Sequence, residues 1–182
     1  MSITTDVTDH KRLDRGRIGP LLLVGLGLML LLAGVGWLAV DRLVIGQGKI
    51  TLPDSLAGWP LSTQVSGRPA LVEIERLHGK SFLMVDGAVA RYGDGMATVW
   101  VSSTWTPFLA ERQVAVMTER IAEGRSPFTP VGADEREGVT VYALTGMGQR
   151  HYYFQRETRV VWLAVSPQFA EESLEELIYD LR

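Results

Sequence analysis

The chain has 182 residues, 21% of them charged, a formal net charge of −3 and no cysteine. The missing cysteine excludes disulfide bonds, thiolate catalysis, cysteine zinc sites and a lipidated cysteine anchor. Residues 1–17 sum to +1, which leaves −4 for the rest. Because so mildly acidic a domain lacks the basic surface of nucleic-acid-binding proteins, we expect no nucleic-acid partner. At this length the chain accommodates one domain and short appendages.

An uncharged apolar run of 23 residues extends from residue 18 to residue 40. A helix rises about 1.5 Å per residue, so this run spans about 34 Å, enough to cross a hydrocarbon core of about 30 Å. The sequence therefore predicts one transmembrane helix over residues 18–40, with the lipid bilayer as its partner. A cleaved signal peptide is the alternative, but its apolar region is usually only about 7–15 residues long. Gly34-Val35-Gly36 is the only stretch that resembles a cleavage site, which favours an uncleaved signal anchor.

The charges on either side of this run predict its orientation. Four basic residues lie within positions 11–17, whereas Arg42 and Lys49 alone follow the run closely. The more basic flank of a membrane span stays in the cytoplasm. We therefore expect a single-pass protein of the cell membrane, with a cytoplasmic tail at residues 1–17 and its domain outside.

Residues 41–69 are rich in glycine and proline and predict a juxtamembrane connector. Their LPDSLAGWP stretch, residues 52–60, stands just behind the anchor. It resembles the LPxxLxGW-like opening of anchored accessory domains such as those associated with exosortases. This chain lacks the cysteine motif of those proteins, so we assign no function from the resemblance.

Residues 70–182 predict an extracytoplasmic α+β domain whose first part consists of strands. Residues 71–77 alternate with a period of two, and a turn follows at residues 78–80. Asp86-Gly87 is a strong hairpin signal between strands at 82–85 and 88–92. A second turn, Gly93-Asp94-Gly95, leads into a strand at 96–102.

The second part of this domain predicts a helix, a loop, three strands and a final helix. Thr106 followed by Pro107 is a helix start, and apolar residues then recur every three or four positions, which predicts a helix over residues 107–123. A loop follows at 125–138. Strands are expected at 139–145, 149–156 and 159–165, joined as an antiparallel meander, and a last helix from Ser166-Pro167 to about Leu181. The expected domain thus has a mainly antiparallel sheet of about six to seven strands and two packed helices.

Catalytic and metal-binding motifs do not emerge from the sequence. The histidines are His10, His78 and His151, and none stands in a known catalytic motif. Met147 and His151 offer a thioether and an imidazole, ligands that suit copper, but a turn and a strand need not bring them together. We expect no enzyme activity, no cofactor and no metal.

Five aromatic residues form the candidate interaction surface: Trp100, Tyr142, Tyr152, Phe154 and Trp162. They lie on predicted strands, and large aromatic side chains are enriched at protein interfaces. The alternative is that they belong to the core beneath the helices.

These features predict a membrane-anchored, extracytoplasmic, non-catalytic accessory or binding protein with a membrane protein as its possible partner. A sensor or carrier domain for a small apolar ligand is the alternative, and an unrecognised hydrolase is a third. A pocket lined by aromatic side chains would favour the ligand-binding alternative.

Overall fold

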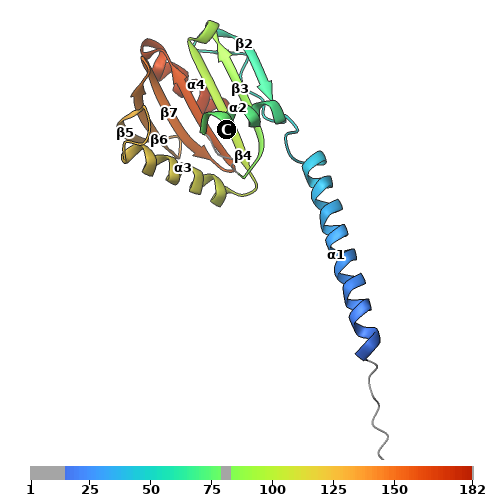
Figure 1. Ribbon diagram of the computed structural model, residues 1–182. Helices are drawn as coiled ribbons and strands as arrows, with labels where there is room; N and C mark the ends of the chain where they lie inside the picture. Colours follow the sequence, from blue (N-terminus) through green and yellow to red (C-terminus); the bar gives the residue numbers. More distant parts are fainter. Residues whose placement is uncertain (1–14, 79–82, 182) are drawn as a thin grey trace, which may run out of the picture. The chain divides into compact units, whose positions relative to one another are not determined.

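The computed structural model describes residues 15–78 and 83–181 (Figure 1). Most of the predicted tail at residues 1–17, including His10, therefore lies outside the described residues. Part of the predicted turn at 78–80 also lies outside them. The chain divides into two compact units, which meet between Arg42 and Leu43. The first unit contains the long helix α1, Arg15–Leu43.

Helix α1 carries the apolar run that the sequence analysis identified. Its stretch Gly19–Leu43 covers 25 residues with a mean hydropathy of 2.4, and none of its most apolar window is buried against the rest of the protein. This helix is long and apolar enough to cross a membrane. Pro20 is the sixth residue of this helix, just beyond the four amide groups that have no intrahelical partner, so it removes one intrahelical hydrogen bond near the start of α1.

The second unit is built around one antiparallel sheet. Its strands are β1 (Ser55–Leu56), β2 (Trp59–Ser66), β3 (Met84–Tyr92), β4 (Ala97–Thr104), β5 (Thr129–Arg136), β6 (Val139–Gly146), β7 (Gln149–Arg156) and β8 (Arg159–Val165). They are arranged in the order β1-β2-β3-β4-β8-β7-β6-β5. The predicted α+β class and the meander of β6, β7 and β8 are confirmed, with eight strands in place of six or seven. Strand β8 lies between β4 and β7, as expected of a strand that is apolar on both faces.

Helices cover both faces of the sheet (Figure 1). Helices α2 (Arg68–His78) and α3 (Pro107–Ala122) pack on one face, and α4 (Ala170–Asp180) packs on the other. Thr106 caps α3 by accepting a hydrogen bond from the Leu109 amide, which confirms the predicted start. The predicted last helix begins with a 3-10 turn at Pro167–Phe169 and continues as α4.

Residues 71–77, predicted as a strand, belong to helix α2 instead. This segment satisfies both periods, because Ala70, Leu71 and Ile74 also fall on one side of a helix. All three side chains are buried, whereas Val72 and Leu77 are exposed. Pro69 in the first turn is a helix-start signal that the sequence analysis did not use.

The predicted hairpin at Asp86-Gly87 is also wrong, because β3 runs straight through it. A side chain at Gly87 would come within 3.1 Å of Leu71 and 3.3 Å of Ile74, so the glycine gives α2 room to pack against the strand. The Asp86 carboxylate accepts hydrogen bonds from the backbone amides of Gly48 (3.0 Å) and Lys49 (2.7 Å). Asp86 and Gly87 thus both contact segments that are distant in the sequence.

Two segments predicted to lack regular structure contain strands. The predicted loop at 125–138 contains β5, an edge strand that pairs only with β6 and is exposed over almost its whole length. The predicted connector at 41–69 contains β1 and β2. It also places Ile50, Leu52 and Leu56 in the core between the sheet and α4.

Candidate interaction surface

Four aromatic residues form a row across the face of the sheet that α2 and α3 cover. The strand register pairs Trp100 with Trp162, Trp162 with Tyr153, and Tyr153 with Tyr142. Residues paired in this way point to the same side of a sheet. The row therefore crosses β4, β8, β7 and β6 in that order, and it includes three of the five predicted surface residues.

Three of these rings stack on one another. The ring centroids of Tyr142 and Tyr153 lie 4.8 Å apart at an interplanar angle of 10°, and those of Tyr153 and Trp162 lie 5.4 Å apart at 11°. Such aromatic pairs contribute about 0.5–1.5 kcal/mol each beyond the apolar area that they bury. The stack therefore stiffens this half of the sheet.

Helix α3 closes over the stack. Ala110, Val114 and Met117 pack against it, and the Tyr153 hydroxyl lies 2.9 Å from the Thr118 hydroxyl. Tyr153 is almost fully buried, and burial raises the pKa of its hydroxyl group. Trp100, Tyr142 and Trp162 remain half-buried, so only parts of their rings reach the surface.

His151 lies at one end of the stack and is buried. The Trp162 indole N–H donates to His151 Nδ1 at 3.2 Å, and His151 Nε2 lies 3.1 Å from the Gly146 carbonyl oxygen. Because Nδ1 accepts, the ring proton must be on Nε2, where it is donated to Gly146. The centroids of the Phe128 and His151 rings lie 4.6 Å apart. Burial lowers the pKa of this histidine, so the neutral form is favoured.

The state of His151 predicts a pH dependence of stability. Between its lowered pKa in the folded state and 6.5 in the unfolded state, the unfolded chain binds more protons. Acidification from about pH 8 to about pH 5 should therefore lower the free energy of unfolding, with a slope from this group of at most about 1.4 kcal/mol per pH unit. Urea unfolding of the wild type and of His151→Phe at each pH measures this contribution. If the free energy of unfolding falls equally on acidification in the two proteins, the effect belongs to groups other than His151.

Tyr152 and Phe154, the other two predicted surface residues, point to the opposite face. Both are buried in the core beneath α4, and Phe154 has no exposed area. These two residues therefore fit the alternative interpretation, in which the aromatic side chains belong to the core beneath the helices. The structure divides the five predicted residues between the two sides of the sheet, and they form no common surface.

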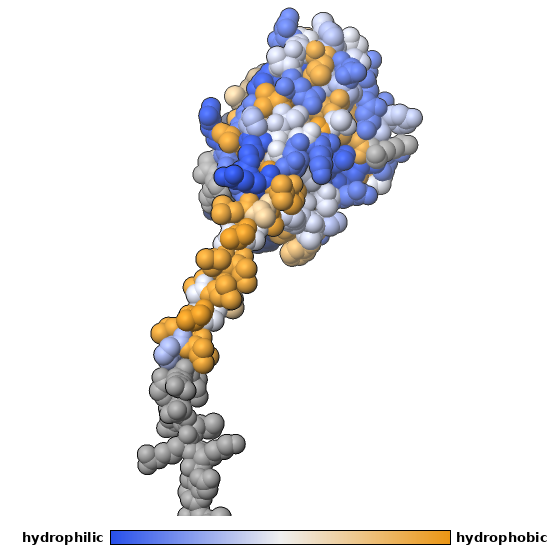
Figure 2. Space-filling view, turned by 90° about the vertical axis from the view of Figure 1, so that its right-hand side faces the viewer, coloured by the Kyte–Doolittle hydropathy of each residue, from blue (hydrophilic) through white to orange (hydrophobic). Residues whose placement is uncertain are grey.

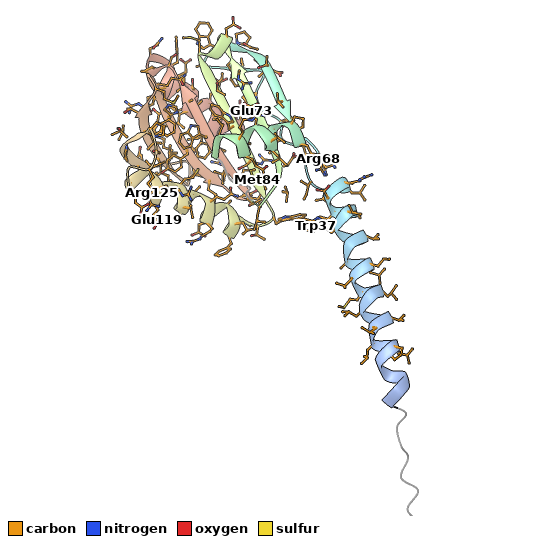
Figure 3. All side chains as sticks on the ribbon, viewed as in Figure 1. Trp37, Arg68, Glu73, Met84, Glu119 and Arg125 are labelled. Carbon is orange, nitrogen blue, oxygen red and sulfur yellow. The ribbon has the colours of Figure 1, made fainter. Side chains whose placement is uncertain are left out.

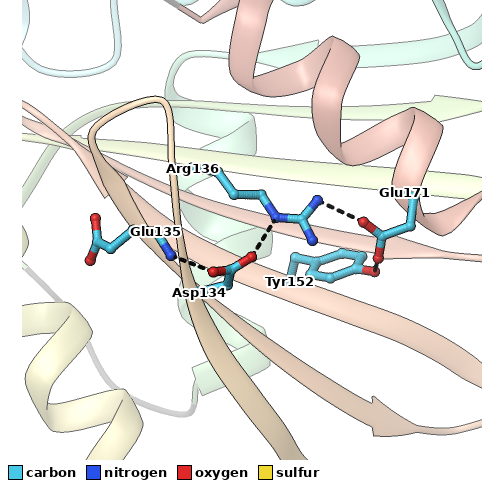
Figure 4. Close-up of polar contacts among 5 residues, drawn as sticks. All are labelled: Asp134, Glu135, Arg136, Tyr152 and Glu171. Atoms are coloured by element: carbon cyan, nitrogen blue, oxygen red, sulfur yellow. Dashed lines mark hydrogen bonds and ion pairs between the residues drawn. The ribbon is translucent and has the colours of Figure 1, made fainter.

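Tyr152 joins a polar network at the rim of the sheet (Figure 4). Its hydroxyl donates to Glu171 at 2.9 Å, and Arg136 donates to the other Glu171 oxygen at 2.6 Å. Burial, followed by the contact with Glu171, raises the pKa of Tyr152 to about 12, and the Arg136 hydrogen bond lowers the pKa of Glu171. The Arg136–Asp134 ion pair (3.4 Å) extends the network along β5. These contacts tie the β5 edge to α4.

Two of the depressions on the described surface of the domain have mainly polar linings. One is lined by residues of the β5–β6 and β7–β8 turns, including Glu137, Arg156 and Glu157. The other lies between residues 51–55 and the acidic side chains of Glu176 and Asp180. None of the five predicted aromatic residues lines either depression.

Among the described residues, no group of three or more histidine, aspartate or glutamate side chains is placed to hold a metal ion. His151 is engaged by Trp162 and Gly146. Met147 lies in the β6–β7 turn with its side chain 77% exposed. The copper-binding alternative therefore gains no support from the geometry.

The structure draws attention to an apolar group that the sequence analysis missed. Leu83, Trp105 and Phe108 are exposed, and we call these three residues the apolar edge. Leu83 precedes β3, Trp105 follows β4, and Phe108 stands in the first turn of α3. Two aromatic residues on either side of the Thr106-Pro107 helix start were the available signal.

Comparison of the chain with protein-family models, with curated proteins and with solved structures found no match.

Proposed function

We propose that this protein is a membrane-anchored, extracytoplasmic accessory or binding protein, without catalytic activity, that is a subunit or partner of a membrane-associated assembly. The observation that carries the proposal is the surface of α1. Its apolar side chains are exposed along the described length, whereas the face of the domain seen in Figure 2 mixes apolar and hydrophilic residues. An apolar surface of this length is stable in a lipid bilayer and costly in water.

The distribution of charge supports a cytoplasmic N-terminus. Four basic and three acidic residues lie in residues 1–17, with the basic ones gathered at positions 11–17 next to the uncharged run, and the domain that follows is mildly acidic. The cytoplasmic side of a membrane span is the side richer in lysine and arginine.

The contacts of the polar groups in the domain support a non-catalytic role. Asp86 holds the backbone of residues 48 and 49, and His151 bridges Trp162 and Gly146. Glu171 accepts from Tyr152 and Arg136. These contacts link elements of the fold, and the aromatic rings stack on each other where a ligand-binding pocket would need them apart. The small-ligand alternative therefore has less support.

A reporter enzyme that is active only outside the cytoplasm tests the topology. Fused after Arg182, it should be active. Leu28→Arg should sharply reduce the yield of inserted protein, because an arginine at the centre of a span costs about 2.5–3.5 kcal/mol during insertion. Leu28→Ile is the matched control and should insert normally. A stable but inactive fusion would contradict the proposed orientation.

Purification of the full-length protein in a mild detergent, from the membranes of the cells that produce it, tests whether it belongs to an assembly. A membrane protein should co-purify in constant ratio through two chromatographic steps, and Leu28→Arg should abolish the association. Elution of the wild type as a single species without a second protein would contradict the role as a subunit.

A further inference from the structure

Three segments of the domain meet at one end of the sheet. Met84 pairs with Thr104, so Leu83 and Trp105, which flank this pair, lie at the same end of β3 and β4. The Gly46 amide donates to the Val85 carbonyl at 2.7 Å, which brings the chain leaving α1 to this end as well. Figure 3 labels Met84 at this end of the sheet and Arg68, which lies beside Gly46. Glu119 and Arg125, also labelled, lie at the other end of α3.

The side chains at this end are unusually exposed for their type. Leu83 is 67% exposed, Trp105 49% and Phe108 69%. Thr106 already supplies the cap of α3, so neither aromatic ring is required to start the helix. Such a group of large apolar side chains on the surface of a domain is typical of a contact with a membrane or a partner.

The link between this end and α1 is short. Helix α1 ends at Leu43, and only two residues separate it from Gly46. Three residue steps span at most about 11 Å. A side chain at Gly46 would come within 2.4 Å of Arg68, so the link packs closely against the domain. If α1 crosses a bilayer, this short link limits how far this end of the sheet can lie from that bilayer.

We infer that Leu83, Trp105 and Phe108 insert into the interface of the bilayer that holds α1. This inference rests on the proposed membrane anchor. Tryptophan and phenylalanine are favoured at the boundary between headgroups and acyl chains. Because α1 already holds the domain at the surface, the local concentration of lipid is high, and a weak affinity suffices for docking.

The insertion is driven by apolar contact. Charged residues of both signs stand around this end of the sheet: Glu111 and Arg112 one turn beyond Phe108, Glu157 and Arg159 at the β7–β8 turn, and Arg68 beside Gly46. The Thr104 amide donates to the Thr158 carbonyl, which places that turn at the same end of the sheet. Because acidic and basic side chains are mixed at this end, docking should not require anionic lipids.

Spin labels on single cysteines test the inference, since the chain has no cysteine of its own. The full-length protein is labelled in turn at Leu28→Cys, Phe108→Cys and Met147→Cys, and reconstituted into phosphatidylcholine vesicles. Collisions of each label with oxygen, which concentrates in lipid, are compared with collisions with a water-soluble nickel complex. Met147 is the matched control, because it is an exposed apolar residue in the β6–β7 turn, at the other end of the sheet.

The ratio of oxygen to nickel collisions should be several-fold higher at positions 28 and 108 than at position 147. Equal ratios at 108 and 147, with a high ratio at 28, would overturn the docking and leave the anchor intact. A low ratio at position 28 would overturn the anchor and the docking together. A high ratio at 108 that appears only after phosphatidylserine is added would overturn the apolar mechanism. Trp105→Cys repeats the measurement at a second position of the apolar edge.

Discussion

Phe154→Ala should lower the free energy of unfolding of the domain by about 3–5 kcal/mol, the usual cost of truncating a buried aromatic side chain. Phe154 has no exposed area and lies between the sheet and α4. The lost ring leaves a cavity in close-packed surroundings, and the whole domain has a stability of only about 5–15 kcal/mol. Denaturant unfolding of the full-length protein in detergent, followed by tryptophan fluorescence, measures the change.

Phe108→Ala is the matched control for this prediction. It removes the same ring from a position that is 69% exposed, so the free energy of unfolding should change by less than about 0.5 kcal/mol. Similar losses in the two variants would contradict the assignment of Phe154 to the core and of Phe108 to the surface.

Asp86→Ala should lower the free energy of unfolding by about 2–4 kcal/mol. The buried carboxylate accepts backbone hydrogen bonds from Gly48 (3.0 Å), Lys49 (2.7 Å) and Gly87 (2.9 Å). A hydrogen bond to a charged group contributes about 1.5–3 kcal/mol, and such contributions do not add fully within one cluster. Hydrogen exchange should also accelerate at the amides of residues 48 and 49, because the link after α1 loses its attachment to β3.

Two variants serve as comparisons for Asp86→Ala. Asp86→Asn retains one acceptor oxygen and should lose less stability. Glu172→Ala removes an exposed carboxylate on α4 and should change the free energy of unfolding by less than about 0.5 kcal/mol. Unchanged stability and unchanged exchange in Asp86→Ala would contradict its role as the attachment point of the segment that follows α1.

The correct predictions came from signals that are local in the sequence. The run of apolar residues in α1, the Thr106-Pro107 start of α3 and the apolar stripe of α4 each depend on residues within a few turns of one another. The same holds for the strand patterns of β6 and β7 and for the continuous apolar run of β8. Short turns then limited these strands to an antiparallel meander.

The incorrect predictions occurred where distant contacts decide the structure. Residues 71–77 fit a helix and a strand equally well, and packing of Leu71 and Ile74 against Gly87 selects the helix. Asp86-Gly87 has the local signal of a hairpin, but Asp86 binds the backbone of residues 48 and 49. Strand β5 is exposed on both faces, so no apolar pattern marks it, and pairing with β6 alone defines it.

The candidate surface shows the same division. In β7 the period of two places Tyr152 and Phe154 on one side and His151 and Tyr153 on the other, and the contacts of these residues in the structure fit this alternation. The alternation along a strand does not show which side of the sheet each helix covers. Helices lie on both faces, and the register between strands aligns Tyr142, Tyr153 and Trp162 into a stack.

By itself, the sequence determined an apolar helix followed by an α+β domain with an antiparallel sheet, because caps, turns and periodicity act over a few residues. Only the tertiary structure decided the strand order and the helical state of residues 68–78. It also decided that Leu83 and Trp105 lie at the same end of the sheet, where the segment that follows α1 is hydrogen-bonded to β3. Those features depend on hydrogen bonds and packing between residues that are distant in the sequence, whose pairing is set by the whole core.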